Sequence, residues 1–153
     1  NTGEQMFQEA AVLAEKATNP EQKVRAKMNL AFHLHRLERV EVRDELIQQA
    51  FVTLDEIPDA RQRSDVTADL ASRLLQVELT DLADQAFEQA EKQAISIEDP
   101  LSRGYALCKI SDSLSKGKRA KAAQRLLDQA KEVAEKVADK GLRSELLKRI
   151  ANQ

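Results

Sequence analysis

Hydrophobic positions recur at helical spacing along the whole chain, and the order of large, small and polar residues returns at a fixed interval. Four alanines show the interval most clearly, because Ala10, Ala50, Ala90 and Ala130 follow one another at steps of 40. A fixed interval of this length is the sequence signature of a repeat architecture. The chain therefore contains repeats of 40 residues.

Five further positions keep the same register in all four copies. They are an apolar position (Ala17, Ile57, Ile97, Val137), a capping position (Asn19, Asp59, Asp99, Asp139), a basic position (Lys23, Arg63, Arg103, Arg143), a large position (Leu30, Leu70, Ile110, Ile150) and a small position (Ala31, Ala71, Ser111, Ala151). No gap is needed to align them. Agreement of this kind across four copies indicates one structural unit that is repeated.

Each repeat is predicted to hold two helices, because apolar residues recur three and four positions apart within it. The expected helices are 3–18, 20–37, 40–57, 59–76, 79–97, 99–115, 119–138 and 140–152. No segment alternates polar and apolar residues as a half-buried strand does. The predicted fold is all-α, an α-solenoid of antiparallel helix pairs with about eight helices.

The stretch ISIEDPLSR between two helices has the composition of a helix start. Asp99 is expected to accept hydrogen bonds from the first backbone N–H groups of the next helix. Pro100 then stands at the first helical position, where a missing N–H is harmless. We expect Arg103 to pair with Asp99 across one turn, and Gly117 to end the helix in the left-handed conformation.

The order of small and large residues resembles the tetratricopeptide repeat. The first helices carry the large-small-large sets Leu30-Ala31-Leu34, Leu70-Ala71-Leu74 and Ile110-Ser111-Leu114. The second helices carry the small-large-small sets Gly3-Phe7-Ala10, Ala83-Phe87-Ala90 and Ala123-Leu127-Ala130, from which Arg43-Ile47-Ala50 departs at its first member. The period is 40 rather than the family's 34 residues, and the family's aromatic pair in the first helix is absent. Other helical-hairpin repeats of the HEAT kind are the alternative.

The resemblance implies a right-handed superhelix whose first helices line a groove that binds a protein or peptide. The groove positions that it implies are Arg25, Met28, Asn29, Phe32, His35, Arg36, Asp65, Asp69, Ser72, Leu75, Tyr105, Cys108, Lys109 and Asp112. These positions differ between copies, whereas the core positions repeat. Phe32 is the most informative, because its counterparts Ser72 and Asp112 show that the core does not require an aromatic ring there.

Composition narrows the classes of partner. The chain has 153 residues, with 24 basic against 26 acidic side chains and only 3% aromatic residues. This balance disfavours nucleic acid and anionic membranes as the main ligand. A local basic run (Lys116, Lys118, Arg119, Lys121, Arg125) keeps an RNA-binding helical repeat as an alternative. No apolar run is long enough to span a membrane, and we expect a cytoplasmic protein.

Candidate chemistry is sparse. His33 and His35 are two positions apart on a helix and point in different directions, so they cannot share a metal ion. Cys108 is the single cysteine, and a small buried or groove-lining residue is the expected role. No phosphate loop, nucleophile elbow or metal-ligand spacing occurs. The sequence therefore predicts no catalytic activity, no metal and no cofactor.

These observations predict a non-catalytic protein-interaction scaffold formed by a single repeat domain over residues 1–153. The alternative is a structural solenoid segment of a larger multidomain protein. Helix 3–18 has the pattern of a second helix without a first, and helix 140–152 that of a first helix without a second. Uncovered end repeats expose apolar surface, so we expect either a longer solenoid or self-association through the terminal helices.

Overall fold

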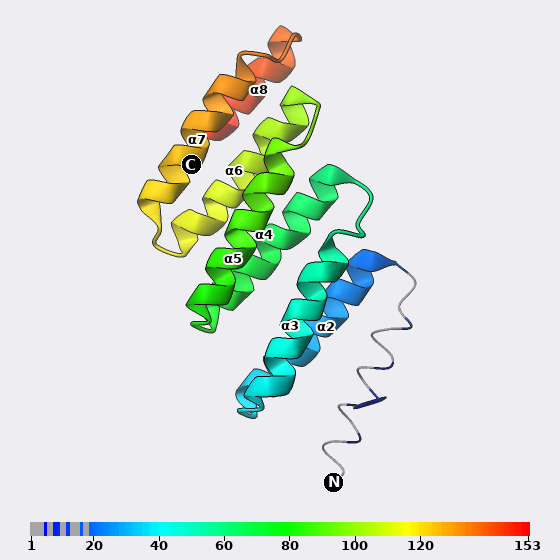
Figure 1. The fold of residues 1–153 in the computed structure, drawn as a ribbon. Helices are drawn as coiled ribbons and strands as arrows, with labels where there is room; N and C mark the ends of the chain where they lie inside the picture. The colour runs from blue at the N-terminus through cyan, green and yellow to red at the C-terminus, as the bar shows by residue number, and fades with distance from the viewer. Residues whose placement is uncertain (1–4, 6–7, 10–11, 13–15, 17–18) are drawn as a thin grey trace. The chain divides into compact units, whose positions relative to one another are not determined.

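The computed structural model describes residues 5, 8, 9, 12, 16 and 19–153. Seven helices occupy the continuous part: α2 (Pro20–Arg36), α3 (Val40–Leu54), α4 (Ala60–Gln76), α5 (Thr80–Ile95), α6 (Pro100–Lys116), α7 (Ala120–Ala134) and α8 (Lys140–Ala151) (Figure 1). No strand occurs among the described residues. The all-α helical-repeat architecture is confirmed. The predicted helix 3–18 lies largely outside the described residues.

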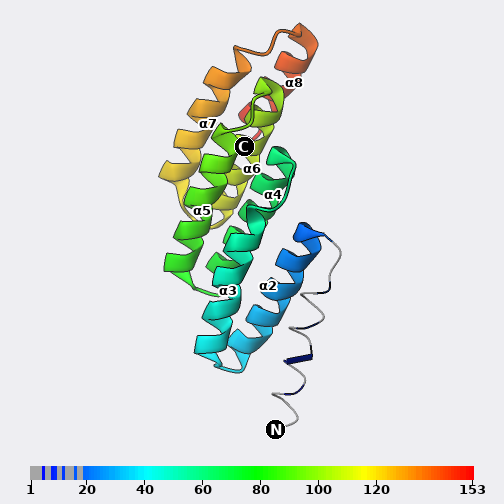
Figure 2. The ribbon, with the colours of Figure 1, turned by 45° about the vertical axis from the view of Figure 1, so that its right-hand side comes forward.

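The helices group into two compact units, residues 1–58 and 59–153. In the first unit, α2 and α3 form an antiparallel hairpin. In the second unit, α4 pairs with α5 and α6 with α7, while α8 packs against α6 and α7. The first helices α4, α6 and α8 form one layer of this unit, and α5 and α7 form the other (Figure 2). A single domain over the whole chain stays a prediction.

The repeated small and large positions form the core. Ala50, Ala90 and Ala130 are completely buried in their helices, which lets the facing helices approach closely. The apolar position under each turn is buried as well, at Ile57, Ile97 and Val137. The 40-residue register therefore reflects packing at these positions.

One polar side chain caps the N-terminus of the first helix in each of the four repeats. The side chains of Asn19, Asp59, Asp99 and Asp139 each accept a hydrogen bond from the backbone N–H three residues later, at 2.8 to 3.0 Å. The predicted N-caps are thus confirmed in every copy. Arg103 does not pair with Asp99. Its guanidinium donates instead to the carbonyl oxygen of Ile97, two residues beyond the end of α5, at 2.9 Å.

The left-handed helix end falls one residue later than the sequence predicted. Gly117 has a φ of −83°, whereas Lys118 and its counterparts Glu38 and Glu78 have φ values of 63°, 59° and 64°. In each case the next backbone N–H bonds back to the last turn, as in a Schellman cap. Gly117 serves another purpose, since a Cβ there would overlap Cδ2 of Leu75. The absence of a side chain at position 117 leaves room for Leu75.

We expect Asp99→Ala to lower the free energy of unfolding by about 1 kcal/mol, because it removes the only side-chain cap of α6. Urea denaturation followed by circular dichroism measures the change. Asp99→Asn is the matched control and should cost little, since asparagine caps nearly as well. Equal losses for both variants would show that charge rather than capping stabilises this turn.

Candidate functional site

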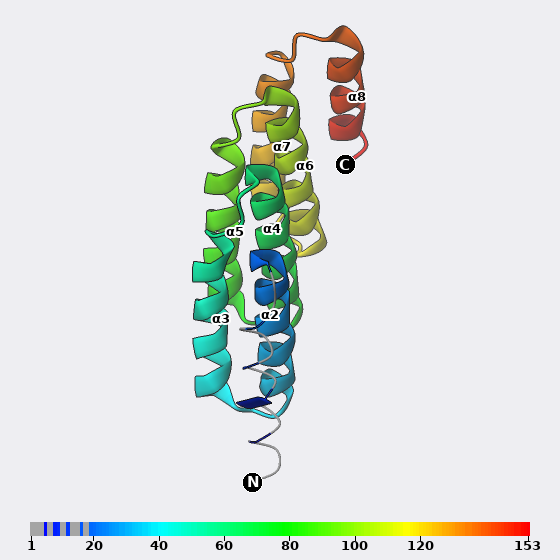
Figure 3. The same cartoon turned by 90° about the vertical axis from the view of Figure 1, so that its right-hand side faces the viewer.

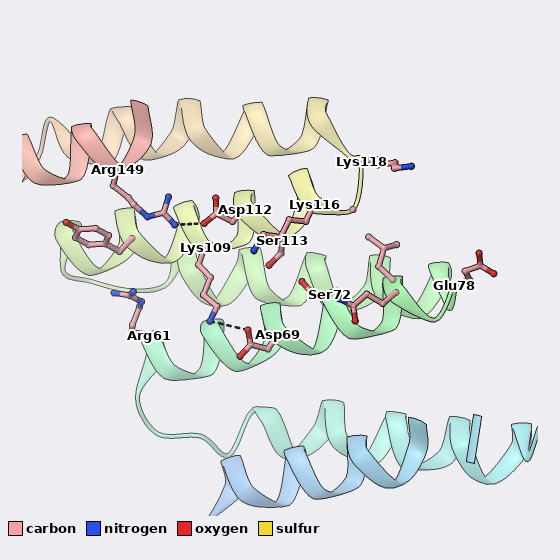
Figure 4. A pocket seen from close by; sticks show the side chains of 14 residues that line it. Arg61, Asp69, Ser72, Glu78, Lys109, Asp112, Ser113, Lys116, Lys118 and Arg149 are labelled. Atoms are coloured by element: carbon pink, nitrogen blue, oxygen red, sulfur yellow. Dashed lines mark hydrogen bonds and ion pairs between the residues drawn. The ribbon is translucent and has the colours of Figure 1, made fainter. Parts of the chain in front are cut away.

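A cleft of about 890 Å³ runs over the first helices of the second unit. Its walls come from α4, α6, α8 and the two turns that follow α4 and α6 (Figure 4). The lining residues are Arg61, Asp69, Ser72, Leu75, Gln76, Glu78, Tyr105, Lys109, Asp112, Ser113, Lys116, Gly117, Lys118 and Arg149. Six of them (Asp69, Ser72, Leu75, Tyr105, Lys109 and Asp112) are among the predicted groove positions.

Two ion pairs cross the floor of the cleft from one first helix to the next. Lys109 on α6 contacts Asp69 on α4, with 3.1 Å between Nζ and Oδ1, and Arg149 on α8 pairs with Asp112 on α6 (Figure 4). Asp69, Lys109 and Arg149 occupy the same position in successive repeats. The side chains are between a third and two fifths exposed. They are held in place but remain accessible to a ligand.

One end of the cleft carries an aromatic ring beneath a cation. The guanidinium carbon of Arg61 lies 5.8 Å from the centroid of the Tyr105 ring, within cation–π distance. Arg61 also contacts Asp65 on the same helix at 3.2 Å. Asp65 therefore lies beside the cleft as the partner of a lining residue.

The other end carries two lysines at the close of α6. In the continuously described part of the chain, the side chains of Lys116 and Lys118 have no ion-pair or hydrogen-bond partner. Glu78 is the carboxylate that lines this end. Leu75, which covers Gly117, supplies apolar surface next to the lysines. Positive charge beside an apolar side chain thus marks this end.

Three predicted groove positions are core positions instead. Met28 is 2% exposed, Phe32 is 8% exposed and Cys108 is fully buried. Ala68, the counterpart of Met28 and Cys108, is also fully buried, so this position faces the interior in each hairpin. Phe32 stands at the edge of the apolar face of α2. Its ring turns toward the core, because burial there removes more of its apolar surface from water than an outward orientation would.

Burial also decides the chemistry of Cys108. Desolvation raises the pKa of its thiol from 9.0 to about 11, because the thiolate would lose its hydration in the interior. The thiol is therefore protonated at neutral pH. This environment is that of a structural cysteine rather than a nucleophile.

The remaining predicted positions lie on α2 in the first unit. Arg25 pairs with Glu21 one turn earlier, at 3.0 Å, and Asn29 and Arg36 are exposed. His35 is half-buried, and its Nδ1 lies 2.9 Å from Nη1 of Arg43.

Arg43 occupies the first small position of α3, where the repeat pattern failed. It is 9% exposed. Its guanidinium is shared between His35 and Asp44, which it contacts at 2.8 Å. The departure from the pattern therefore has a structural reason. The long side chain of Arg43 occupies the small-residue position and supplies a polar partner for the ring nitrogen of His35.

Several lining residues were absent from the predicted set. Arg149 could have been found, because it continues the position of Asn29, Asp69 and Lys109 into the last first helix. Lys116, Gly117 and Lys118 line the cleft because the turn after α6 reaches it. No spacing in the sequence indicates that reach.

The basic run between α6 and α7 is partly used for packing. Arg119 pairs with Asp84 and lies 6.0 Å from the centroid of the Phe87 ring. Arg125 contacts Glu91 on α5 at 2.5 and 3.0 Å, and this guanidinium lowers the pKa of the Glu91 carboxyl. Two of the five cations thus join α7 to α5. An RNA-binding surface would have only the other three to use.

Among the described residues, no cluster of three or more histidine, cysteine or acidic side chains could hold a metal ion. Within the same residues, no helix is both long enough and apolar enough to cross a membrane.

No protein-family model matches the chain, and no curated protein matches it. Among solved structures it is similar to the crystal structure of Ton1535 from Thermococcus onnurineus NA1, with a TM-score of 0.76 and 16% sequence identity. The match covers 99% of this chain and 43% of that chain. The chain thus spans less than half the length of that protein, and at this identity the likeness shows the fold alone.

Proposed function

We propose that this chain is a non-catalytic, tetratricopeptide-like interaction module that binds an acidic segment of a partner protein in the cleft over α4, α6 and α8. The carrying observation is the cleft itself. It is lined by side chains that differ from repeat to repeat, whereas α4 and α6 bury the same set of positions. Packing against the core does not require the polar and charged residues among them, and we take ligand binding as the reason for their choice.

The charge of the cleft selects the partner. Five lining residues are cationic (Arg61, Lys109, Lys116, Lys118, Arg149) and three are anionic (Asp69, Asp112, Glu78). The two ion pairs on the floor neutralise Lys109 and Arg149. Lys116 and Lys118 then offer charge at one end that is not neutralised by an ion pair, and opposite charge across an interface favours encounter and register. Leu75 and Tyr105 provide surface for an apolar side chain of the ligand.

Labelled peptides of alternating Glu and Leu, and of alternating Lys and Leu, test this charge preference by fluorescence anisotropy. We expect the acidic peptide to bind more tightly, and Lys116→Glu with Lys118→Glu to weaken it about tenfold, which corresponds to 1.4 kcal/mol. Binding should also weaken with added salt, because exposed charges are screened. Lys121→Glu with Lys131→Glu, on the exposed face of α7, is the matched control. Tighter binding of the basic peptide would contradict the proposal.

The second candidate, a structural segment of a larger protein, is favoured by the length of the similar solved structure, of which the match covers less than half. In that case the cleft would have no ligand. Neither peptide would then bind, and the cleft variants would behave as wild type.

A further inference from the structure

The two cations on the floor of the cleft are each held by a carboxylate of the neighbouring first helix. Nζ of Lys109 lies 3.1 Å from Oδ1 of Asp69 on α4, and Arg149 pairs with Asp112 on α6 (Figure 4). Both aspartates line the cleft themselves. The two cations in the middle of the cleft therefore already have anionic partners on its own walls.

We propose that Asp69 and Asp112 are internal competitors of the ligand, which occupy Lys109 and Arg149 until carboxylates of the bound acidic segment displace them. This inference rests on the proposed function, because it concerns how the same cleft takes its acidic segment. It assigns the two aspartates a regulatory role, since they lower the affinity of the cleft for that segment.

The repeat itself does not require an aspartate at either position. The counterparts in the other copies are Asn29, Lys109 and Arg149 for Asp69, and Phe32, Ser72 and Asn152 for Asp112. None of these counterparts is a carboxylate. Negative charge at the two positions is thus a property of this cleft rather than of the repeated unit.

The ion pairs are accessible enough to exchange. Their four side chains are between 36% and 40% exposed, so water already solvates part of each charge. An ion pair in such a setting contributes little to stability, because solvent weakens its attraction. A ligand carboxylate that reaches Lys109 or Arg149 therefore replaces one contact by another of similar strength, and the aspartate reduces the gain on binding.

The two aspartates also set the charge of the whole cleft. Its lining has five cationic and three anionic residues, a net charge of +2. With Asp69→Asn and Asp112→Asn, only Glu78 remains as an anion of the lining, and the net charge becomes +4. Glu78 lies at the other end of the cleft from Arg149 (Figure 4). It is therefore not positioned to replace Asp112 as the partner of that guanidinium.

Fluorescence anisotropy with the labelled peptide of alternating Glu and Leu tests the inference. We expect Asp69→Asn and Asp112→Asn each to tighten binding about threefold, and the double variant about tenfold, because each released cation gains a ligand carboxylate without first losing a partner. The peptide of alternating Lys and Leu should gain no affinity. Wild-type affinity of the double variant for the acidic peptide would overturn the inference and leave the proposed function standing.

Two ion pairs between α5 and α7 provide a matched control. Arg119 pairs with Asp84, and Arg125 contacts Glu91 at 2.5 Å. Neither carboxylate lines the cleft, because both belong to the layer of second helices; Figure 3 shows α5 and α7 to the left of α6 and α8. Asp84→Asn with Glu91→Gln removes the same charge and opens the same number of ion pairs, and should leave the affinity unchanged. Equal tightening in this control would attribute the effect to net charge and contradict the inference.

A double-mutant cycle separates the release of a cation from the general loss of a negative charge. Asp69→Asn should tighten binding of the acidic peptide in the wild-type background but not in the Lys109→Gln background, where no cation is left to release. Equal tightening in both backgrounds would show that Asp69 acts only through the overall charge of the cleft, and the competition would be overturned.

Thermal unfolding followed by circular dichroism distinguishes this role from a structural one. The double variant Asp69→Asn/Asp112→Asn should keep the melting temperature of the wild type, because partly exposed ion pairs contribute little. A marked fall would make the pairs structural and contradict their exchange with a ligand. Binding of the acidic peptide by the double variant alone would support the inference, whereas binding by neither protein would overturn the proposed function together with it.

Discussion

Phe32→Ala is expected to lower the free energy of unfolding by about 3 kcal/mol, the lower part of the range for a buried aromatic ring that is removed. The ring is only 8% exposed, so alanine would leave a cavity in the hairpin of α2 and α3. The sequence pattern had indicated the opposite, because Ser72 and Asp112 occupy the same position in the next repeats.

Urea denaturation followed by far-UV circular dichroism measures this loss, and Ser72→Ala is the matched control at the equivalent position. Ser72 is half-buried, so its replacement should change the free energy of unfolding by no more than about 0.5 kcal/mol. A loss below about 1 kcal/mol for Phe32→Ala would show that the ring is exposed, as the sequence predicted.

Leu146→Ala is expected to have a similarly large effect, about 3 kcal/mol, because the leucine is fully buried where α8 packs on α6. The packing there is unusually close. A Cβ added to Gly104 would lie 2.5 Å from Cδ2 of Leu146. Gly104→Ala should therefore be destabilising by about 1 to 3 kcal/mol from overpacking, reduced by about 1 kcal/mol from the better helix propensity of alanine.

The double variant distinguishes this contact from two independent effects. With Leu146 shortened to alanine, the methyl group of Ala at position 104 occupies space that the leucine has left. Gly104→Ala should then stabilise the Leu146→Ala background rather than destabilise it. Additive losses in the double-mutant cycle would show that the two positions do not contact one another.

Most of the fold could be predicted from the sequence, since local signals and packing agree at nearly every helix. Asn19 and the three aspartates at its position cap helices as expected, because capping depends only on neighbouring backbone N–H groups. Arg103 was assigned the wrong partner, since its choice between a carboxylate and the Ile97 carbonyl depends on how α5 ends. The sequence around Arg103 does not determine which of these two acceptors its guanidinium takes.

The candidate site was predicted in part. Asp69, Lys109 and Asp112 stand on helix faces that the periodicity defines, and they line the cleft. Met28 and Cys108 were predicted wrongly. The sequence pattern placed their shared position on the exposed side of the first helix, whereas each hairpin buries that position.

Selection of peptides from a random library on the immobilised chain is the most direct test of the central claim, that the cleft recognises an acidic segment. We expect enrichment of sequences that combine Asp or Glu with an apolar residue on the wild type and on the Lys121→Glu/Lys131→Glu control. The Lys116→Glu/Lys118→Glu variant should lose that enrichment. Enrichment of basic sequences, or of the same acidic sequences on all three proteins, would contradict it.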